Sequence, residues 1–474
     1  MPDPGLMASK MRAYMEALSP AARTMLVRAM RSAQERGESD MPTQAIMKAV
    51  AALDRDGSEA QAAKPAAPQA PWDEQLRQAF LAPLQPFVCD AAFSTKLTAR
   101  IQRRSLDGLW TFLVRDFAPS DFAEALSAGQ TDAGLDAVAA ARKLRRVVTP
   151  RLAQLLQSGD ESSKEIRRLA VQLGGDMALQ DLADVVYVFQ KESAFLNLTG
   201  QLPKTLSAFE MSDTGPVSEL TKKCIDTLQI DPAFVAVVLL QRCTSAANLA
   251  LLAMTLSGLT DPRLLQTSAY ARLVDAAIAE AQVWVYRFEN HLVSRQTRQQ
   301  ALGDLGEYHE LVRQLELTLQ PTQVPVWHRR LGAARKQMSD LIGHEIEPLP
   351  GLIRRALRVE TAAGGFGGQF DAETAEDAEF GIRLMVEARN ALDSLALNEM
   401  VTKLRRPVEQ TIEVVTAKLM TDLKAGQSGD RGDILKAVDA AIRMSAITFG
   451  EDYAAVMRKS RDIAVNKPAK SASA

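Results

Sequence analysis

Helix-start signals recur along this chain and constrain its fold more than any other feature. Aspartate or serine stands directly before proline at Ser19-Pro20, Asp231-Pro232 and Asp261-Pro262, where the polar side chain can cap a helix whose first turn accepts proline. Between such signals, apolar residues recur at steps of three and four, as they do over 94–117, and no stretch alternates with period two for long enough to make a strand. The chain is therefore predicted to be all-α.

Composition supports this prediction, because strand-forming residues are scarce. Aromatic residues make up only 5% of the chain, whereas Ala, Leu and Met, which lose little entropy in a helix, are plentiful. Long helical patterns over 268–294, 296–320 and 375–406 are joined by short connections, which is typical of antiparallel hairpins. No repeat of fixed period is found, so we expect a multi-helix bundle or an irregular α-solenoid of stacked helical hairpins. The apolar faces of these patterns carry three large side chains that should be largely buried, Trp110, Trp284 and Phe288.

The chain divides into segments of different composition. Residues 1–55 form a small separate N-terminal module of three predicted helices, and residues 56–71 (DGSEAQAAKPAAPQAP) form a linker, because they have no bulky apolar side chain to bury. The main helical body is predicted over 72–360, a glycine-rich loop over 361–372 and a C-terminal helical group over 373–465. The last residues, 466–474, are expected to be a disordered tail.

Three features indicate a cytoplasmic protein. Cys89, Cys224 and Cys243 are far apart and lie in apolar stretches, as reduced core thiols do. The N-terminus lacks the apolar core of a signal peptide. The most apolar stretch, 233–259, is interrupted at its centre by polar residues and falls short of the ~20 apolar residues that a membrane span needs, so we expect buried helices there.

Signatures of catalysis and of cofactor binding are absent from the sequence. The four histidines lack the spacing of zinc ligands and are interpreted as surface or helix-end residues, although a cluster formed only in the folded chain stays open. The GGFGG segment resembles a phosphate loop, but no strand precedes it, and the carboxylates that open the next helix would repel phosphate: Asp371, Glu373, Glu376 and Asp377. We expect no cofactor and no metal, and the balance favours a protein that is not an enzyme.

Two basic clusters are candidates for anion binding. One contains Arg142, Lys143, Arg145, Arg146 and Arg151. The other contains Arg354, Arg355 and Arg358, and is preferred because Arg354 and Arg358 should share a helix face behind a proline-rich turn. The competing interpretation is that both clusters are solvated helix faces paired with Asp and Glu. Nucleic acid is not favoured as a ligand, because the net charge is -2 and neither cluster is interleaved with aromatic residues.

Methionine is concentrated at the N-terminus, where eight of the 17 fall within the first 50 residues. Met7, Met11 and Met15 are spaced so that they line one face of the first predicted helix. This stripe is either the core of the small N-terminal module or a soft apolar surface that docks a partner helix.

Two functions from different classes therefore remain. The first is a non-enzymatic cytoplasmic interaction or scaffold protein, whose tethered N-terminal module docks a protein partner through Met7, Met11 and Met15. The second is a helical enzyme or small-molecule sensor that holds an anionic ligand between helices with arginines. The two can be distinguished because only the second predicts a metabolite-dependent rise in thermal stability.

Overall fold

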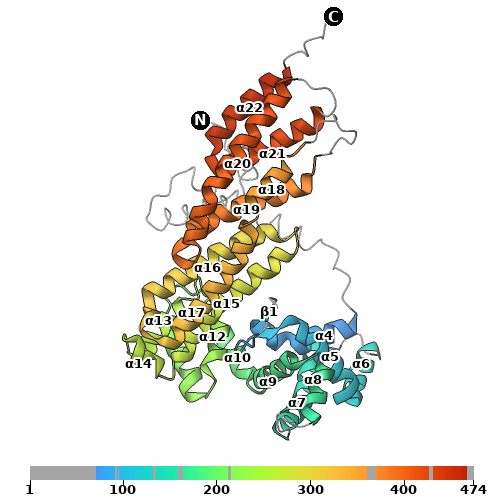
Figure 1. Ribbon diagram of the computed structural model, residues 1–474. Helices are drawn as coiled ribbons and strands as arrows, with labels where there is room; N and C mark the ends of the chain where they lie inside the picture. Colours follow the sequence, from blue (N-terminus) through green and yellow to red (C-terminus); the bar gives the residue numbers. More distant parts are fainter. Residues whose placement is uncertain are drawn as a thin grey trace, which may run out of the picture. The chain divides into compact units, whose positions relative to one another are not determined.

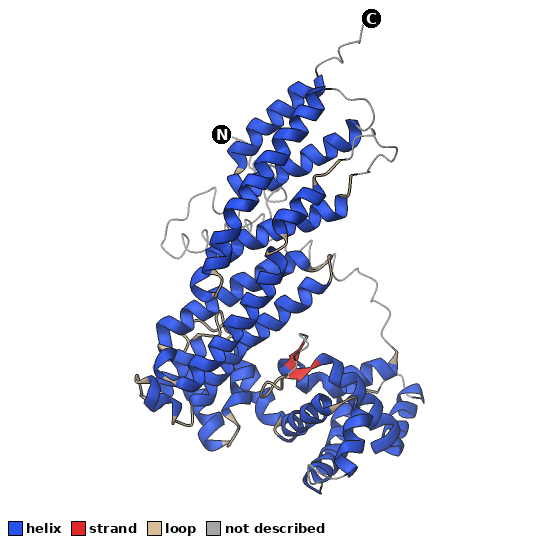
Figure 2. Cartoon of the chain, viewed as in Figure 1, coloured by secondary structure: helices blue, strands red, loops and turns tan. Residues whose placement is uncertain are grey.

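The computed structural model describes residues 71–90, 93, 95–131, 135–158, 164–211, 215–359, 370–425 and 431–466. These residues are almost entirely helical, which confirms the predicted all-α class (Figure 2). Within the described ranges the only extended pairing longer than a single bridge is the parallel pair of two-residue strands β1 (Val88–Cys89) and β2 (Ile101–Gln102). The chain divides into two units, Met1–Gln75 and Leu76–Ala474, and the second contains nearly all of the described residues.

The first described helices pack around one aromatic cluster. They are coloured blue to green in Figure 1, and are α4 (Trp72–Leu81), α5 (Arg103–Phe112), α6 (Pro119–Thr131), α7 (Ala137–Ser158), α8 (Lys164–Leu173), α9 (Asp176–Gln190) and α10 (Glu192–Gln201). The fully buried ring of Phe80 lies 5.3–5.7 Å from the rings of Trp110, Phe122 and Phe189, measured between centroids. Because these rings come from α5, α6 and α9, the cluster joins four helices through edge-on and tilted contacts. A 3₁₀ turn, η1 (Ala82–Phe87), follows α4.

The helix predicted over 94–117 is wrong in its first third. The described residues from 95 to 100 form a loop, β2 follows, and α5 begins only at Arg103 before widening into the π-helical turn η2 (Leu113–Phe117). The physical reason lies in tertiary contacts. Lys96 Nζ lies 2.5 Å from Asp181 Oδ1 and 2.7 Å from Asp184 Oδ2 on α9, and Ala99 is held at a φ of 59°. Local periodicity cannot report such long-range ion pairs.

The next helices surround the long helix α15 (Ala271–Val293). They are α11 (Pro216–Lys222) with its π-helical end η3 (Lys223–Thr227), α12 (Pro232–Leu240), α13 (Asn248–Ser257), α14 (Pro262–Gln266), α16 (Arg298–Leu319), the 3₁₀ turn η4 (Pro321–Gln323) and α17 (Pro325–Ile346). The helix starts at Asp-Pro are as predicted: Asp231 and Asp261 each accept a backbone N–H of the first turn at 2.9 Å. Helix α15 packs against α12, α13, α16 and α17 (Figure 1), and α15 and α16 form the hairpin predicted for 268–320.

The apolar stretch at 233–259 is two helices, α12 and α13, separated by a turn at residues 241–247. Seven of the nine residues of α12 are buried, which agrees with the expectation of buried helices. Among the described residues, every helix is too short or too polar to cross a bilayer.

The final helices are α18 (Leu349–Ala356), α19 (Ala372–Asn390), α20 (Asn398–Ala425), α21 (Arg431–Phe449) and α22 (Glu451–Asn466), coloured orange to red in Figure 1. The single pattern predicted over 375–406 is therefore two helices, with the 3₁₀ turn η5 (Leu392–Ser394) between them. Ser394 is buried there, and its hydroxyl lies 2.8 Å from His309 Nδ1 on α16. The backbone N–H of Ala396 donates to Ser339 Oγ on α17 at 2.9 Å, so side chains from two other helices hold this break.

Helices on the two sides of the glycine-rich segment pack together. Helix α19 contacts α16, α17 and α18, which precede that segment, as well as α21, which follows it. Of the side chains expected to be buried, Phe288 is fully so, whereas Trp110 and Trp284 are only partly covered. The ring of Trp284 is partly exposed, and the guanidinium of Arg287 lies 4.6 Å from its centre in a cation–π contact.

Candidate functional site

The methionine stripe of Met7, Met11 and Met15 lies outside the described residues, which begin at 71. Its role as a partner-binding surface therefore stays a prediction.

The preferred arginine cluster is placed differently from the expectation. Helix α18 ends at Ala356, so Arg358 lies beyond the helix and does not share a helix face with Arg354. Arg354, Arg355 and Arg358 are all exposed, and the first two occupy the last turn of α18. Cations at this end of a helix stabilise it against the partial negative charge of the terminal carbonyls, and those carbonyls disfavour an anion nearby. Anion binding by Arg354, Arg355 and Arg358 stays a prediction.

The other basic cluster lies on α7, which carries five cations and no carboxylate. One of the five is structural. Arg145 is only 4% exposed, and its guanidinium forms a two-bond pair with Glu192 at 2.7 and 2.9 Å. It also donates to the carbonyls of Ala79 and Phe80 at 2.8 and 3.1 Å. With four of its five N–H groups bound in this way, Arg145 joins α7 to α4 and α10 and has a structural role.

Two more of these cations are paired at the surface of the helix. Arg151 Nη1 lies 2.8 Å from Asp121 Oδ2, and its guanidinium lies 5.2 Å from the centre of the Phe117 ring. Lys143 Nζ lies 3.5 Å from Glu124 Oε1, and both of those side chains are largely exposed. A contact of this kind between exposed charges contributes little to stability.

The remaining two cations of α7, Arg142 and Arg146, are exposed, and within the described part of the chain their side chains have no hydrogen-bond or ion-pair partner. They are four residues apart and line one groove of about 690 Å³ between α7 and the junction of α9 with α10. We call it the α7 groove. Its other lining residues are Arg145, Thr149, Pro150, Phe189, Gln190, Glu192, Ser193 and Leu196.

The α7 groove combines unpaired positive charge with apolar surface. Leu196 on α10 is 52% exposed, although it is a large apolar side chain. The one carboxylate of the groove, Glu192, is already bound by Arg145. The groove therefore presents two guanidinium groups beside a leucine, an arrangement that suits a ligand with both carboxylate and apolar parts. The sequence indicated only that Arg142 and Arg146 share one face of a helix without acids of its own, because the opposite wall of the groove comes from α9 and α10.

A second cavity, of about 570 Å³, lies between α12, α15, α17 and the loop at 95–98. Two of its lining arginines already face carboxylates. Arg330 Nη1 lies 2.7 Å from Asp275 Oδ1, and Arg272 Nη1 lies 3.5 Å from Asp231 Oδ2. Between them, alanines from α15 and α17 line the cavity, and Gln282 donates to Gln337 at 2.7 Å. No sequence motif could indicate this cavity, because its residues come from four separate segments.

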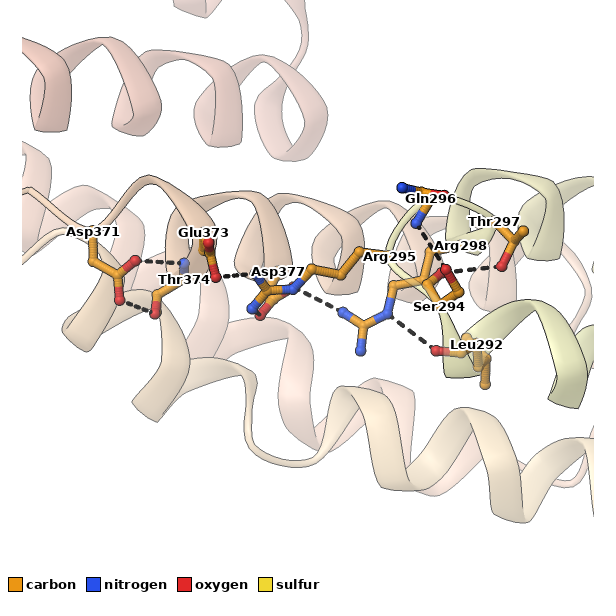
Figure 3. Close-up of polar contacts among 10 residues, drawn as sticks. All are labelled: Leu292, Ser294, Arg295, Gln296, Thr297, Arg298, Asp371, Glu373, Thr374 and Asp377. Carbon is orange, nitrogen blue, oxygen red and sulfur yellow. Dashed lines mark hydrogen bonds and ion pairs between the residues drawn. The ribbon is translucent and has the colours of Figure 1, made fainter.

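A third charged cluster joins the turn between α15 and α16 to the start of α19 (Figure 3). Asp377 accepts hydrogen bonds from Arg295 at 2.9 Å and from Arg298 at 2.8 Å, and Arg295 also contacts Glu373. Asp371 caps α19 by accepting the N–H of Thr374 at 3.1 Å, and a hydrogen bond from the Thr374 hydroxyl lowers the pKa of its carboxyl. These carboxylates were expected to repel phosphate. In the structure Glu373 and Asp377 balance the two arginines, so the cluster holds helices together.

Histidines and cysteines give no candidate centre among the described residues, where no group of three potential metal ligands is found. His291 is not a free surface residue: its Nδ1 lies 2.5 Å from the buried carboxylate of Asp304. None of the three cysteines, all of which lie in the described part of the chain, forms a disulfide, and Cys89 and Cys224 are buried. Burial raises the pKa of the Cys243 thiol to about 12, which keeps it protonated and poorly nucleophilic.

Comparison of the chain with protein-family models, with curated proteins and with solved structures finds no match.

Proposed function

We propose that this chain is a non-enzymatic, cytoplasmic interaction or scaffold protein. The observation that supports it most is the α7 groove, where Arg142 and Arg146 have no partner among the described residues and lie beside the exposed side chain of Leu196. Three cations that are more buried, Lys96, Arg145 and Arg298, are instead matched by carboxylates. An exposed surface with unmatched charge and apolar side chains is typical of a site for another macromolecule.

The opposite side of α7 supports the same proposal. A smaller apolar groove of about 320 Å³ lies between α6 and α7 and is lined largely by alanine, leucine and valine side chains. Val147, which lines this groove, is 42% exposed. Helix α7 thus offers apolar surface to one groove and two arginines without a partner among the described residues to the other, so it is the helix that we expect a partner to contact.

The proposed compartment and the proposed tether rest on the sequence. Three cysteines that form no disulfide in the described part of the chain fit a reducing compartment, where thiols persist. The segment 56–71 has the composition of a flexible tether, which would let residues 1–55, with Met7, Met11 and Met15, bind a partner independently of the helical body.

A small-molecule sensor is the second candidate, and the cavity between α12, α15 and α17 favours it. Arg272 is half-exposed and lies 3.5 Å from Asp231, a carboxylate that already caps α12, so an anionic ligand could compete for this guanidinium. The cavity has a volume typical of small-ligand sites.

One experiment separates the two functions. The full-length chain is expressed in its own cells, cross-linked in place and purified, and the purified chain is also melted with a panel of anionic metabolites. The interaction function predicts reproducible cross-linked protein partners and no metabolite-dependent rise in Tm. A rise in Tm that Arg272→Gln with Arg330→Gln removes, together with no cross-linked partner, would establish the sensor instead.

A further inference from the structure

The spacing of the two unpaired arginines in the α7 groove specifies what it can bind. Arg142 and Arg146 are one helical turn apart, a rise of about 6 Å along the axis. Their guanidinium groups can each take one carboxylate in a two-bond, charge-assisted pair. The complementary ligand therefore carries two carboxylates about 6 Å apart, which is the spacing of acidic residues at i and i+4 on a helix.

The surroundings of these arginines indicate a protein segment rather than a small anion. Arg142, Arg146, Pro150, Gln190 and Ser193 are all exposed, so an inorganic anion or a small carboxylate bound here would stay largely hydrated. Leu196, 52% exposed at the same groove, needs an apolar contact that such anions lack. Nucleic acid fits poorly, because the one aromatic ring that lines the groove, Phe189, is buried and cannot stack on a base.

The α7 groove is held in place before any ligand arrives. Arg145, beneath the two free arginines, is bound to Glu192 at the start of α10 and to two carbonyls of α4. Its guanidinium also lies 5.8 Å from the centre of the Phe189 ring on α9. These contacts fix α7 relative to α9 and α10, which form the opposite wall of the groove. Binding of a partner therefore costs little conformational entropy in this chain.

We propose that the α7 groove binds an acidic, amphipathic helix of a partner protein, with two carboxylates at i and i+4 on Arg142 and Arg146 and an apolar side chain on Leu196. This inference rests on the proposed interaction function and deepens it by naming the chemistry of the partner. The charges of the groove and of this partner are complementary. Glu192, the one carboxylate of the groove, is paired with Arg145 and so does not repel the carboxylates of the partner helix.

The test uses the full-length chain and a defined probe. The probe is a fluorescent helix-forming peptide of about 20 residues, long enough to be helical in isolation, with Glu at i and i+4 and Leu on the same face. A twin peptide carries Gln in place of both glutamates. Binding is measured by fluorescence anisotropy at low and high salt for the wild type, for Arg142→Gln with Arg146→Gln, and for Lys143→Gln. Lys143 is a matched control, because it lies on the same helix and bears the same charge but does not line the groove.

We expect the wild type to bind the Glu peptide, with affinity falling as salt rises, and to bind the Gln peptide about tenfold more weakly. The double arginine variant should lose about tenfold in affinity for the Glu peptide, which corresponds to two exposed ion pairs, and Lys143→Gln should match the wild type. The proposal is overturned if neither peptide binds or if Lys143→Gln weakens binding as much as the arginine changes. Displacement of the Glu peptide by inorganic phosphate or free glutamate, in the wild type and in Lys143→Gln alike, would mark a small-anion site instead.

Failure here can be told apart from failure of the proposed function. If the cross-linked partners of the full-length chain are unchanged by the double arginine variant, the α7 groove is not their site, although the interaction function stands. If the wild type itself has no cross-linked partner and responds to a metabolite, the function is wrong.

Discussion

At the scale of single residues, burial divides a run of similar arginines into different roles. Arg145 falls on the same helical stripe as the buried Ala141, Leu144 and Val148, whereas Arg142 and Arg146 do not. The register of α7 was readable from the sequence, so the structural role of Arg145 could have been predicted. Its partner Glu192 could not, because it lies 47 residues away along the chain.

Replacing Arg145 with Gln should destabilise the protein strongly. The change leaves the carboxylate of Glu192 without its cation in a largely buried position, and removing one partner of a buried pair costs ~3–5 kcal/mol. Urea unfolding of Arg145→Gln and Lys143→Gln measures this, and Lys143→Gln should remain within about 0.5 kcal/mol of the wild type. Equal stability of the two variants would contradict the role given to Arg145.

A second prediction at this scale concerns alkaline pH. Burial raises the pKa of Cys243 to about 12, and burial with the neighbouring Asp226 raises that of Tyr270 to about 12. The folded state therefore holds these protons more tightly than the unfolded chain, where the thiol titrates near ~8.5 and the phenol near ~10. Stability from both groups is complete below the unfolded values and is lost as pH rises toward 12.

Chemical denaturation between pH 8 and pH 11 should show this loss, and Cys243→Ala should reduce it. Alkylation mapped by mass spectrometry at pH 8 should leave Cys243 unmodified until the protein unfolds. Rapid alkylation of Cys243 in the folded protein would contradict the raised pKa of this thiol.

At the scale of elements, sequence periodicity predicted the bounds of a helix well where local residues determine them. It predicted them poorly where contacts with distant residues determine them. The hairpin of α15 and α16 agrees with the predicted ranges, because the apolar stripes and the turn between them are local. The break between α19 and α20 was missed, because His309 and Ser339 hold it from other helices. The loop at 95–100 was missed for the same kind of reason, since Lys96 is bound by two aspartates of α9.

Replacing Lys96 with Met should therefore damage the loop and α9 together. Lys96 separates Asp181 and Asp184, and burial already raises the pKa of Asp184 despite this cation. Without the cation the folded state should favour the protonated carboxyls further, so the cost of ~3–5 kcal/mol near pH 7 should shrink toward pH 5. Urea unfolding at both pH values tests this, and a cost that is the same at both would contradict it.

A weaker element-scale prediction concerns the cluster in Figure 3. Asp377→Asn removes the carboxylate shared by Arg295 and Arg298, so the turn between α15 and α16 should be held less firmly to α19. Because the cluster is partly exposed, we expect a small fall in Tm at low salt that fades in high salt as screening grows. A fall that is independent of salt would indicate a packing role for Asp377.

At the scale of the whole molecule, the class of fold followed from the sequence, but the arrangement of helices did not. Capping residues and the scarcity of strand formers were sufficient for the all-α class. The packing of α19 on helices from both sides of the glycine-rich segment depends on tertiary contacts, and so do the α7 groove and the cavity beside α15. Of the predicted site residues, the structure describes both basic clusters but not the methionine stripe, and it places Arg358 beyond α18.

The measurement that tests the central claim most directly compares partner capture and stability in one pair of proteins, the full-length chain and a chain lacking residues 1–71. From its composition, segment 56–71 is predicted to be a linker, for which chain scaling gives a reach of ~20–25 Å; on this prediction a module on the tether should add little to the stability of the helical body. The account predicts that the deletion leaves the Tm of the body nearly unchanged and strongly reduces the cross-linked partners that the full-length chain captures. A lower Tm or an insoluble product, or an unchanged set of partners, would contradict the tethered docking module.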